Sequence, residues 1–252
     1  MYKFFVDRDQ IDTEGKRVYI TGEDRNHIKN VLRMRIGEEA AVMVPGDENE
    51  YRCAISGYTP DAVELELLFV KECDVELPCE VVICQGLPKA DKMETVITKS
   101  VELGASAIIP VATTRSVVKL DGGREEKKIS RWNAISEAAA KQSKRAVIPE
   151  VLPVMSMQKA IDKCRDFDVK LIPYELSDHD AMDDTRKALE SIKAGSKVAV
   201  FVGPEGGFSE EEVREAIQAG FVPITLGHRI LRTETAAMVV LSWIIYNTEG
   251  KR

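Results

Sequence analysis

The chain has 252 residues, of which 44% are hydrophobic and 31% are charged, and its formal net charge is −7. This composition is typical of a folded globular protein of one large or two modest domains, and it excludes disordered and disulfide-rich classes. No apolar run reaches the roughly 18 residues that a membrane-spanning helix needs, and the first residues contain no signal-peptide core. We therefore expect a cytoplasmic protein that does not bind a membrane.

The cysteines and histidines argue against a metal site. The five cysteines include no CxxC pair, and His27, His179 and His228 lie far apart in the chain. Reduced thiols of this kind are usual in the cytosol, whereas metal ligands recur at short, regular spacings. We expect no metal.

Positive charge is concentrated in two places although the chain is acidic overall. Residues 115–145 contain nine basic and four acidic residues, and residues 25–35 form a second basic run. Such patches can contact the phosphates of a nucleic acid. Charge alone fits a solvated helix face at least as well, because charge runs are common on surfaces.

Residues 1–71 are predicted to form a small β-rich unit. Short alternating segments at 17–20, 40–44, 51–56 and 63–70 are separated by turn residues, and one helical pattern covers residues 24–35. This spacing predicts a small barrel.

From residue 72 onward the pattern changes to that of an α/β domain. Apolar runs at 81–84, 107–111, 169–172, 198–202 and 222–226 alternate with helical patterns at 92–103, 129–144, 210–219 and 233–246. A capping box at Ser209–Glu212 opens the third of these helices. Runs that are apolar on consecutive residues are typical of parallel strands covered on both faces.

Two segments near the C-terminus carry chemistry. Residues 200–209 are a strand, a Gly/Pro loop and a capped helix start, and ligands bind at the carboxyl ends of such strands. A plain turn explains this segment too, and the absence of Gly-Lys-Ser/Thr argues against ATP or GTP. Residues 226–237 follow the next strand and present Arg229 and Arg232 before a helix with Thr233 as its N-cap. Arg232 could pair with Glu234 or Glu205 simply to hold this loop.

Together these segments resemble the ribosomal RNA small subunit methyltransferase E family of the SPOUT class. The similar stretches are FVGPEGGFS at 201–209, LGHRILRTETA at 226–236, HIKNVLRMRIG at 27–37, QGLPKADKME at 85–94, and residues 99–104 and 137–145. They span nearly the whole chain. The one departure from the family pattern that we notice is His228.

The resemblance implies a PUA-like β-barrel over residues 1–71, followed by a SPOUT α/β domain with a deep trefoil knot over residues 72–252. The knot would be made by the segments after residues 172, 202 and 226. The resemblance also implies a homodimer built on the knotted domains. The apolar helix at 236–246 could contribute to that interface, although core packing explains its periodicity equally well.

The implied reaction is transfer of a methyl group from S-adenosylmethionine to N3 of the uridine numbered 1498 in 16S ribosomal RNA of the 30S subunit, with S-adenosylhomocysteine as product. The main alternative is the same chemistry on transfer RNA or 23S ribosomal RNA. A non-catalytic RNA-binding protein and a small-molecule methyltransferase are two further alternatives.

The resemblance also implies site residues. As catalytic residues we expect Arg232, Glu234 and Glu205, with Arg232 stabilising the charge that develops on the base. The cofactor would contact Pro173, Val202, Gly203, Glu205, Gly206, Leu226, Gly227, Ile230, Leu231, Thr235 and Ala236. RNA would contact Arg33, Arg35, Lys89, Lys92, Gln142 and Arg145.

Overall fold

The computed structural model describes residues 1–47, 49–72, 75–116, 122–174 and 181–249. The chain divides into two compact units, the first of which is Met1–Glu76 with Ala140–Ile148 and the second Leu77–Ala139 with Pro149–Arg252. The first boundary thus falls after Glu76 rather than after residue 71, and a segment distant in sequence joins the first unit. No described helix is long and apolar enough to cross a membrane.

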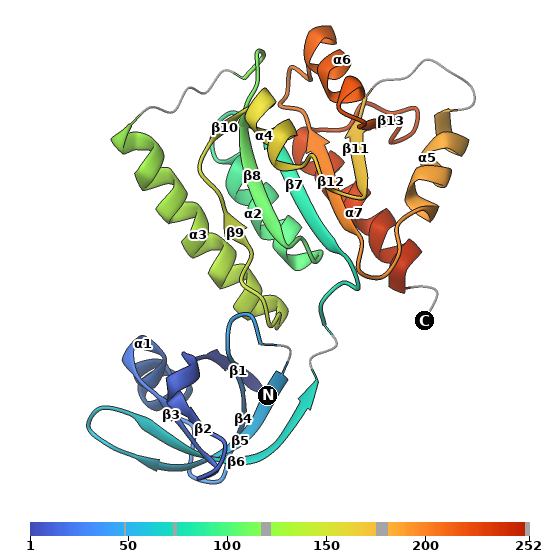
Figure 1. Ribbon diagram of the computed structural model, residues 1–252. Helices are drawn as coiled ribbons and strands as arrows, with labels where there is room; N and C mark the ends of the chain where they lie inside the picture. The colour runs from blue at the N-terminus through green and yellow to red at the C-terminus, as the bar shows by residue number, and fades with distance from the viewer. Residues whose placement is uncertain (48, 73–74, 117–121, 175–180, 250–252) are drawn as a thin grey trace. The chain divides into compact units, whose positions relative to one another are not determined.

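The first unit contains a six-stranded sheet (Figure 1). Its strands, in the order β1-β4-β5-β6-β3-β2, are β1 (Tyr2–Phe5), β4 (Glu39–Met43), β5 (Asn49–Tyr58), β6 (Val63–Glu72), β3 (Arg17–Ile20) and β2 (Ile11–Asp12). Among the described strands of this sheet, β1 and β4 alone pair in parallel. Val63, Leu65 and Leu67 of β6 enter the core, whereas the glutamates between them are more exposed, as the two-residue period of a strand requires.

The helical part of the first unit differs from the single helix predicted over residues 24–35. The short helices are η1 (Arg8–Gln10), α1 (Gly22–Asn26) and η2 (His27–Leu32), and the last of these is a π-helix. Ile28 is fully buried in the core, and Arg33 ends the helix with a φ of 52°. The sequence therefore predicted a helix in this segment, but it did not indicate the change of helix type after Asn26.

The second unit is built on a seven-stranded, entirely parallel sheet. The strand order is β10 (Met155–Ser156), β8 (Ala107–Ala112), β7 (Glu80–Gly86), β12 (Lys197–Val202), β11 (Val169–Pro173) and β13 (Val222–Ile224), and β9 (Glu150–Val151) pairs with β8. All five predicted strands of this domain are present. The two-residue strands β9 and β10 are too short for periodicity to indicate.

Helices cover both faces of this sheet (Figure 1). They are α2 (Lys92–Glu102), α3 (Gly123–Ser143), α4 (Met157–Lys163), α5 (Ala181–Glu190), α6 (Glu210–Gln218) and α7 (Thr233–Glu249). Val198 and Val200 of β12 pack with α2 and α7, whereas Ala199 and Phe201 pack with α4 and α6. The consecutive apolar residues of β12 are thus explained by burial on two faces. Because the strands are parallel, their carboxyl ends share one edge, where the site residues gather.

Candidate functional site

The loop after β12 is held in a tight conformation. A Cβ on Gly86, at the end of the neighbouring strand β7, would lie 2.6 Å from Cδ of Pro204, so only glycine allows these two segments to approach so closely. Gly207 has a φ of 65°, and its N–H donates to the Pro204 carbonyl over 2.8 Å. The predicted capping box is confirmed, since the Ser209 and Glu212 side chains each accept from the other's backbone N–H.

The loop after β13 presents backbone and apolar side chains. Gly227 has a φ of 95°, and no atom lies within 4 Å of the place that a Cβ would take there. Leu226 and Leu231 are half-buried, whereas Ile230 is 90% exposed. Thr225 Oγ1 accepts from the N–H of Gly227 over 3.2 Å, which fixes the start of the loop. The loop therefore combines an accessible backbone with a small apolar surface.

A lysine lies between two carboxylates at this edge of the sheet. Lys92, the first residue of α2, places Nζ 2.8 Å from Oε1 of Glu205 and 3.9 Å from Oε2 of Glu234. Glu205 also accepts from the backbone N–H of Lys89 over 3.1 and 3.2 Å. Oε2 of Glu234 is buried and makes no hydrogen bond to another described residue. The three side chains form a cluster that the sequence did not suggest.

This arrangement differs from the expected pairing of Arg232 with Glu205 or Glu234. Arg232 is exposed, and among the described residues its side chain makes no hydrogen bond or ion pair. Lys92 takes the carboxylates instead, because α2 begins beside the loop that carries Glu205. The guanidinium of Arg232 is therefore available to an anionic or polar ligand.

Lys92 should set the acidity of Glu205. Burial raises the pKa of Glu205, but hydrogen bonds from Lys92 and the Lys89 backbone and the charge of Lys92 outweigh it, so the pKa lies below its ordinary value. The pair therefore stabilises the fold above the ordinary glutamate range, and this contribution disappears as pH falls through the lowered pKa. We expect Lys92→Met to raise the pKa of Glu205 in a carboxyl NMR titration.

The control for this titration is Lys159→Met, which removes an exposed lysine of α4. It should leave the pKa of Glu205 unchanged. An equally low pKa in Lys92→Met would show that the backbone hydrogen bonds alone hold the carboxylate.

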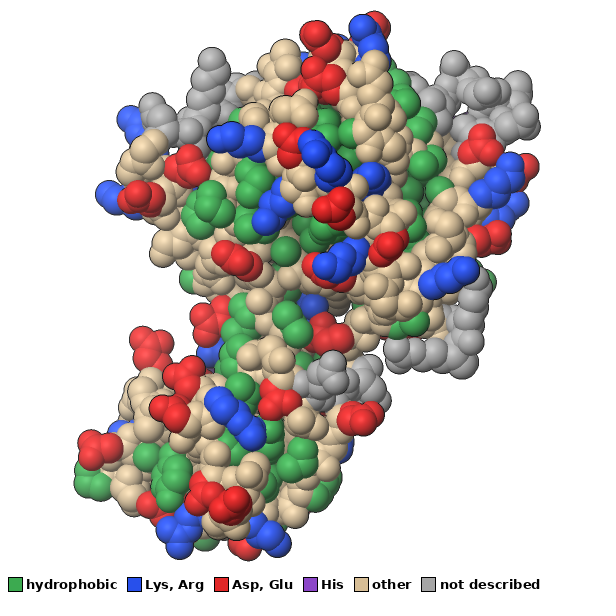
Figure 2. All heavy atoms as spheres, in the orientation of Figure 1, with side chains coloured by type: hydrophobic (Ala, Val, Ile, Leu, Met, Phe, Trp, Pro, Cys, Tyr) green, Lys and Arg blue, Asp and Glu red, His purple; other side chains and the backbone are tan. Residues whose placement is uncertain are grey.

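The residues expected to bind RNA divide into two groups. Arg33, Arg35 and Gln142 of the first unit and Lys89 of the second unit are exposed. Lys92 is engaged by Glu205. Lys119, within the basic run, lies outside the described residues. Figure 2 shows Lys and Arg side chains interspersed with Asp and Glu over the drawn face of the second unit, so this face is not uniformly basic.

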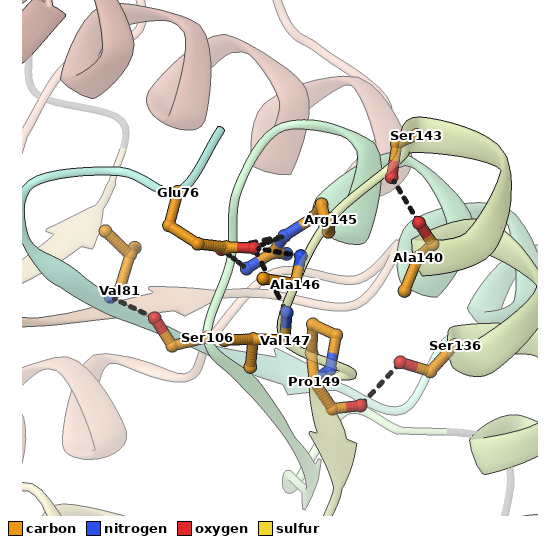
Figure 3. Close-up of polar contacts among 10 residues, drawn as sticks. All are labelled: Glu76, Val81, Ser106, Ser136, Ala140, Ser143, Arg145, Ala146, Val147 and Pro149. Carbon is orange, nitrogen blue, oxygen red and sulfur yellow. Dashed lines mark hydrogen bonds and ion pairs between the residues drawn. The ribbon is translucent and has the colours of Figure 1, made fainter. Parts of the chain in front are cut away.

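Arg145, the remaining member of the expected RNA-binding set, is only 3% exposed. Its Nε lies 3.0 Å from Oε2 of Glu76, and the same carboxylate accepts from the backbone N–H groups of Ala146 and Val147 over 2.9 and 3.2 Å (Figure 3). Glu76, the last residue of the first segment of the first unit, thus holds the residues that follow α3 in place. Because its guanidinium is occupied, we do not include Arg145 among the proposed RNA contacts.

Comparison with known proteins decides the family. The RNA methyltransferase domain family matches residues 75–245, and the RNA methyltransferase PUA domain family matches residues 20–68. The chain is 39% identical over 252 residues to ribosomal RNA small subunit methyltransferase E of Bacillus subtilis (strain 168). The alignment spans 99% of this chain and 98% of the relative. The chain belongs to the ribosomal RNA small subunit methyltransferase E family.

Other members of the methyltransferase E family agree. The Mycobacterium tuberculosis (strain CDC 1551 / Oshkosh) protein is 32% identical to this chain. The aligned region spans 94% of this chain and 88% of that relative. The solved methyltransferase E of Neisseria gonorrhoeae bound to S-adenosylmethionine is 32% identical, with a TM-score of 0.81 and 97% of each chain covered. The expected PUA-like and α/β methyltransferase domains are confirmed.

The loops at the sheet edge fit the cofactor of that methyltransferase E. The space that a Cβ would take at Gly227 is open, so an adenine ring can approach the backbone there, and Leu226, Ile230 and Leu231 offer the apolar surface that its flat faces need. Pro173, Val202, Gly203 and Gly206 lie at or just after the ends of β11 and β12, and Thr235 and Ala236 lie in the first turn of α7. Part of the segment after β11, residues 175–180, lies outside the described residues.

Sequence reasoning gave no role at this edge to three polar residues that the structure brings there, and it expected Thr233 as the N-cap of the helix that the structure begins at Thr233 itself. Gln85 and Thr233 are buried and hydrogen-bonded to each other, and Arg115 Nη1 donates to the Gly206 carbonyl over 3.0 Å. The available indication for Gln85 was its position, since it directly follows the apolar run at 81–84 and so lies at the end of a buried strand. Nothing in the sequence indicates which loop Arg115 contacts.

Proposed function

We propose that this protein transfers a methyl group from S-adenosylmethionine to N3 of a single uridine in 16S ribosomal RNA, at the position numbered 1498. The observation that carries the proposal is the sequence similarity, over nearly the whole chain, to relatives named as small-subunit ribosomal RNA methyltransferases. The identity is 39% to one of them and 32% to another. The fit of the two loops to the cofactor supports it independently. Mass spectrometry of 16S nucleosides from cells with and without the protein tests the proposal. We expect N3-methyluridine in the RNA of cells that have the protein and its loss in cells that lack the protein.

The proposed chemistry needs a cation more than a strong base. Uridine N3 carries a proton that passes to water, and its removal leaves negative charge on O2 and O4 that a positioned guanidinium can stabilise. Arg232, which is exposed and without a described partner, takes this role. Glu205 already accepts from Lys92 and from the Lys89 backbone N–H, so we assign it, with Glu234, to orienting Lys92 at the edge of the site.

The cofactor supplies the methyl group as an activated sulfonium, and the chain holds it. We assign Leu226, Gly227, Ile230 and Leu231 to the adenine, on the grounds of their accessible backbone and apolar side chains. We assign the remaining contacts to Pro173, Val202, Gly203, Glu205, Gly206, Thr235 and Ala236.

RNA binding is assigned to the exposed members of the expected set: Arg33, Arg35, Lys89 and Gln142. Each basic residue that contacts a phosphate displaces a counterion, so binding weakens as salt rises. We expect Arg33→Ala and Lys89→Ala each to reduce the slope of log affinity against log salt by about 0.7–0.9. Lys159→Ala on α4 is the control. Equal slopes in all these variants would show that the assigned residues are ordinary surface.

We further propose that the protein acts as a cytoplasmic homodimer with α7 at the interface. Val239 and Trp243 of this helix are partly exposed and Tyr246 is 81% exposed, which leaves apolar surface for a partner. A monomeric mass by light scattering would contradict the dimer. The trefoil knot of the family also stays a proposal, and an experimental density map with an unthreaded C-terminal helix would refute it.

The main alternative substrate is another RNA, either transfer RNA or 23S ribosomal RNA. Methylation assays on isolated 30S subunits, 50S subunits and transfer RNA separate the three. We expect incorporation into the 30S subunit or its RNA. Preferential methylation of another RNA would keep the enzyme class and overturn the substrate.

A further inference from the structure

A buried amide lies where β7 ends. Gln85 is fully buried, and its Nε2 donates to Oγ1 of Thr233 over 2.8 Å and to the Gly86 carbonyl over 2.9 Å. The carbonyls of Val202 and Gly203 lie farther from the same nitrogen, at 3.4 and 3.5 Å. Four oxygens thus surround one NH₂ group, which fixes the orientation of the amide, since its oxygen could not accept from any carbonyl.

The Thr233 hydroxyl extends this network to the loop after β12. Oγ1 of Thr233 donates its single proton to the Gly203 carbonyl over 2.6 Å, so it must accept from Gln85. Thr233 is the first residue of α7 and is 5% exposed. One amide therefore connects the end of β7, the end of β12 and the start of α7.

Two of these three segments carry charged side chains of the site. Thr233 lies between Arg232 and Glu234 in the chain, and Gly203 lies two residues before Glu205. A shift of the Gln85 amide would move these groups relative to one another, and a displacement of about 1 Å can lower a rate by about 10²-fold. The amide itself has no route to a ligand, because it is fully buried.

The Gln85 amide is not explained by the stability of the fold alone. Its Oε1 is buried and makes no hydrogen bond to another described residue. A buried carbonyl without a donor destabilises a fold relative to an apolar group of similar size. The benefit of Gln85 must therefore lie in the arrangement that its nitrogen holds.

We propose that Gln85 is a positioning residue for methyl transfer, which acts through Thr233 and the Gly203 carbonyl on the charged groups of the site. The inference rests on the proposed function. It predicts that loss of the amide affects turnover more than substrate binding or stability.

The test compares Gln85→Leu and Thr233→Val with the conservative variant Thr233→Ser. We expect the first two to lower kcat by roughly 10- to 100-fold, with KM for RNA and the melting temperature little changed. Thr233→Ser keeps the hydroxyl and should retain most of the activity. The double variant Gln85→Leu with Thr233→Val should be little worse than either single variant, because both break one network.

Ser100→Ala is the matched control, since Ser100 is a buried polar residue of α2 whose hydroxyl makes no described hydrogen bond. It should leave kcat unchanged. Full kcat in Gln85→Leu, or additive losses in the double variant, would overturn the inference. If Gln85→Leu fails to fold, the comparison of Thr233→Val with Thr233→Ser still decides it.

Amide hydrogen exchange gives a readout that does not depend on the reaction. We expect faster exchange at residues 203–206 and 232–236 in Gln85→Leu than in the unaltered chain. Unchanged exchange there would also overturn the positioning role. An unaltered chain that methylates no RNA would instead refute the proposed function, while the exchange experiment would still test the network.

Discussion

Replacing Arg232 by alanine should lower kcat by about 10²- to 10³-fold and leave the affinity for S-adenosylmethionine nearly unchanged. The reason is that its exposed guanidinium has no described protein partner and is therefore available to the charge that develops on the pyrimidine. Calorimetry with the cofactor and single-turnover methylation of 30S subunits measure the two quantities separately.

The matched control for this experiment is Arg229→Ala. Arg229 is a second exposed arginine of the same loop, and we assign it no role in the reaction. Its removal should change kcat little. If Arg232→Ala instead lost cofactor binding and kept kcat in saturating cofactor, Arg232 would be a cofactor ligand and the electrostatic role would be wrong.

Removing Arg145 or Glu76 should destabilise the first unit by about 3 kcal/mol. Arg145→Ala takes the guanidinium from the Glu76 carboxylate, and Glu76→Ala takes a carboxylate from Arg145, which is 3% exposed. Glu76→Ala should be the more damaging change, because the backbone N–H groups of Ala146 and Val147 lose their acceptor too (Figure 3). Urea denaturation followed by a probe in the first unit measures the effect.

Lys144→Ala provides the control, since Lys144 is the neighbouring exposed cation and its backbone carbonyl contact with Lys3 is kept. We expect it to change the free energy of unfolding by less than about 0.5 kcal/mol. A stable Arg145→Ala protein with a reduced salt slope for RNA binding would show that Arg145 contacts RNA, as the sequence alone indicated.

The Arg145 result illustrates the limit of charge patterns. The nine basic residues of 115–145 are indistinguishable in the sequence, yet Arg145 is buried while Gln142 and Lys144 beside it are exposed. Burial of a guanidinium depends on a carboxylate that the chain supplies 69 positions earlier. No local pattern around residue 145 contains that information.

The same limit applies to the charged cluster at the sheet edge. Glu205, Lys92 and Glu234 were each selected from the sequence, but Arg232 was expected to be the partner of the two acids. The partner is set by parallel pairing of β7 with β12, which brings the start of α2 beside the loop after β12. Adjacency of strands that are more than a hundred residues apart is a property of the folded sheet.

By itself, the sequence determined the fold class, the two-part organisation, the strands of the second unit longer than two residues, its helices α2, α3, α6 and α7 but not α4 and α5, and the family. The elements follow from local periodicity, caps and glycine positions, which act over a few residues, whereas the family follows from the resemblance of its motifs. Only the tertiary structure decided which cations are free, which are locked in ion pairs, and that Gln85 connects three segments. Those outcomes depend on burial and on contacts between distant segments, because a charge or amide acquires its role from the groups that folding places around it.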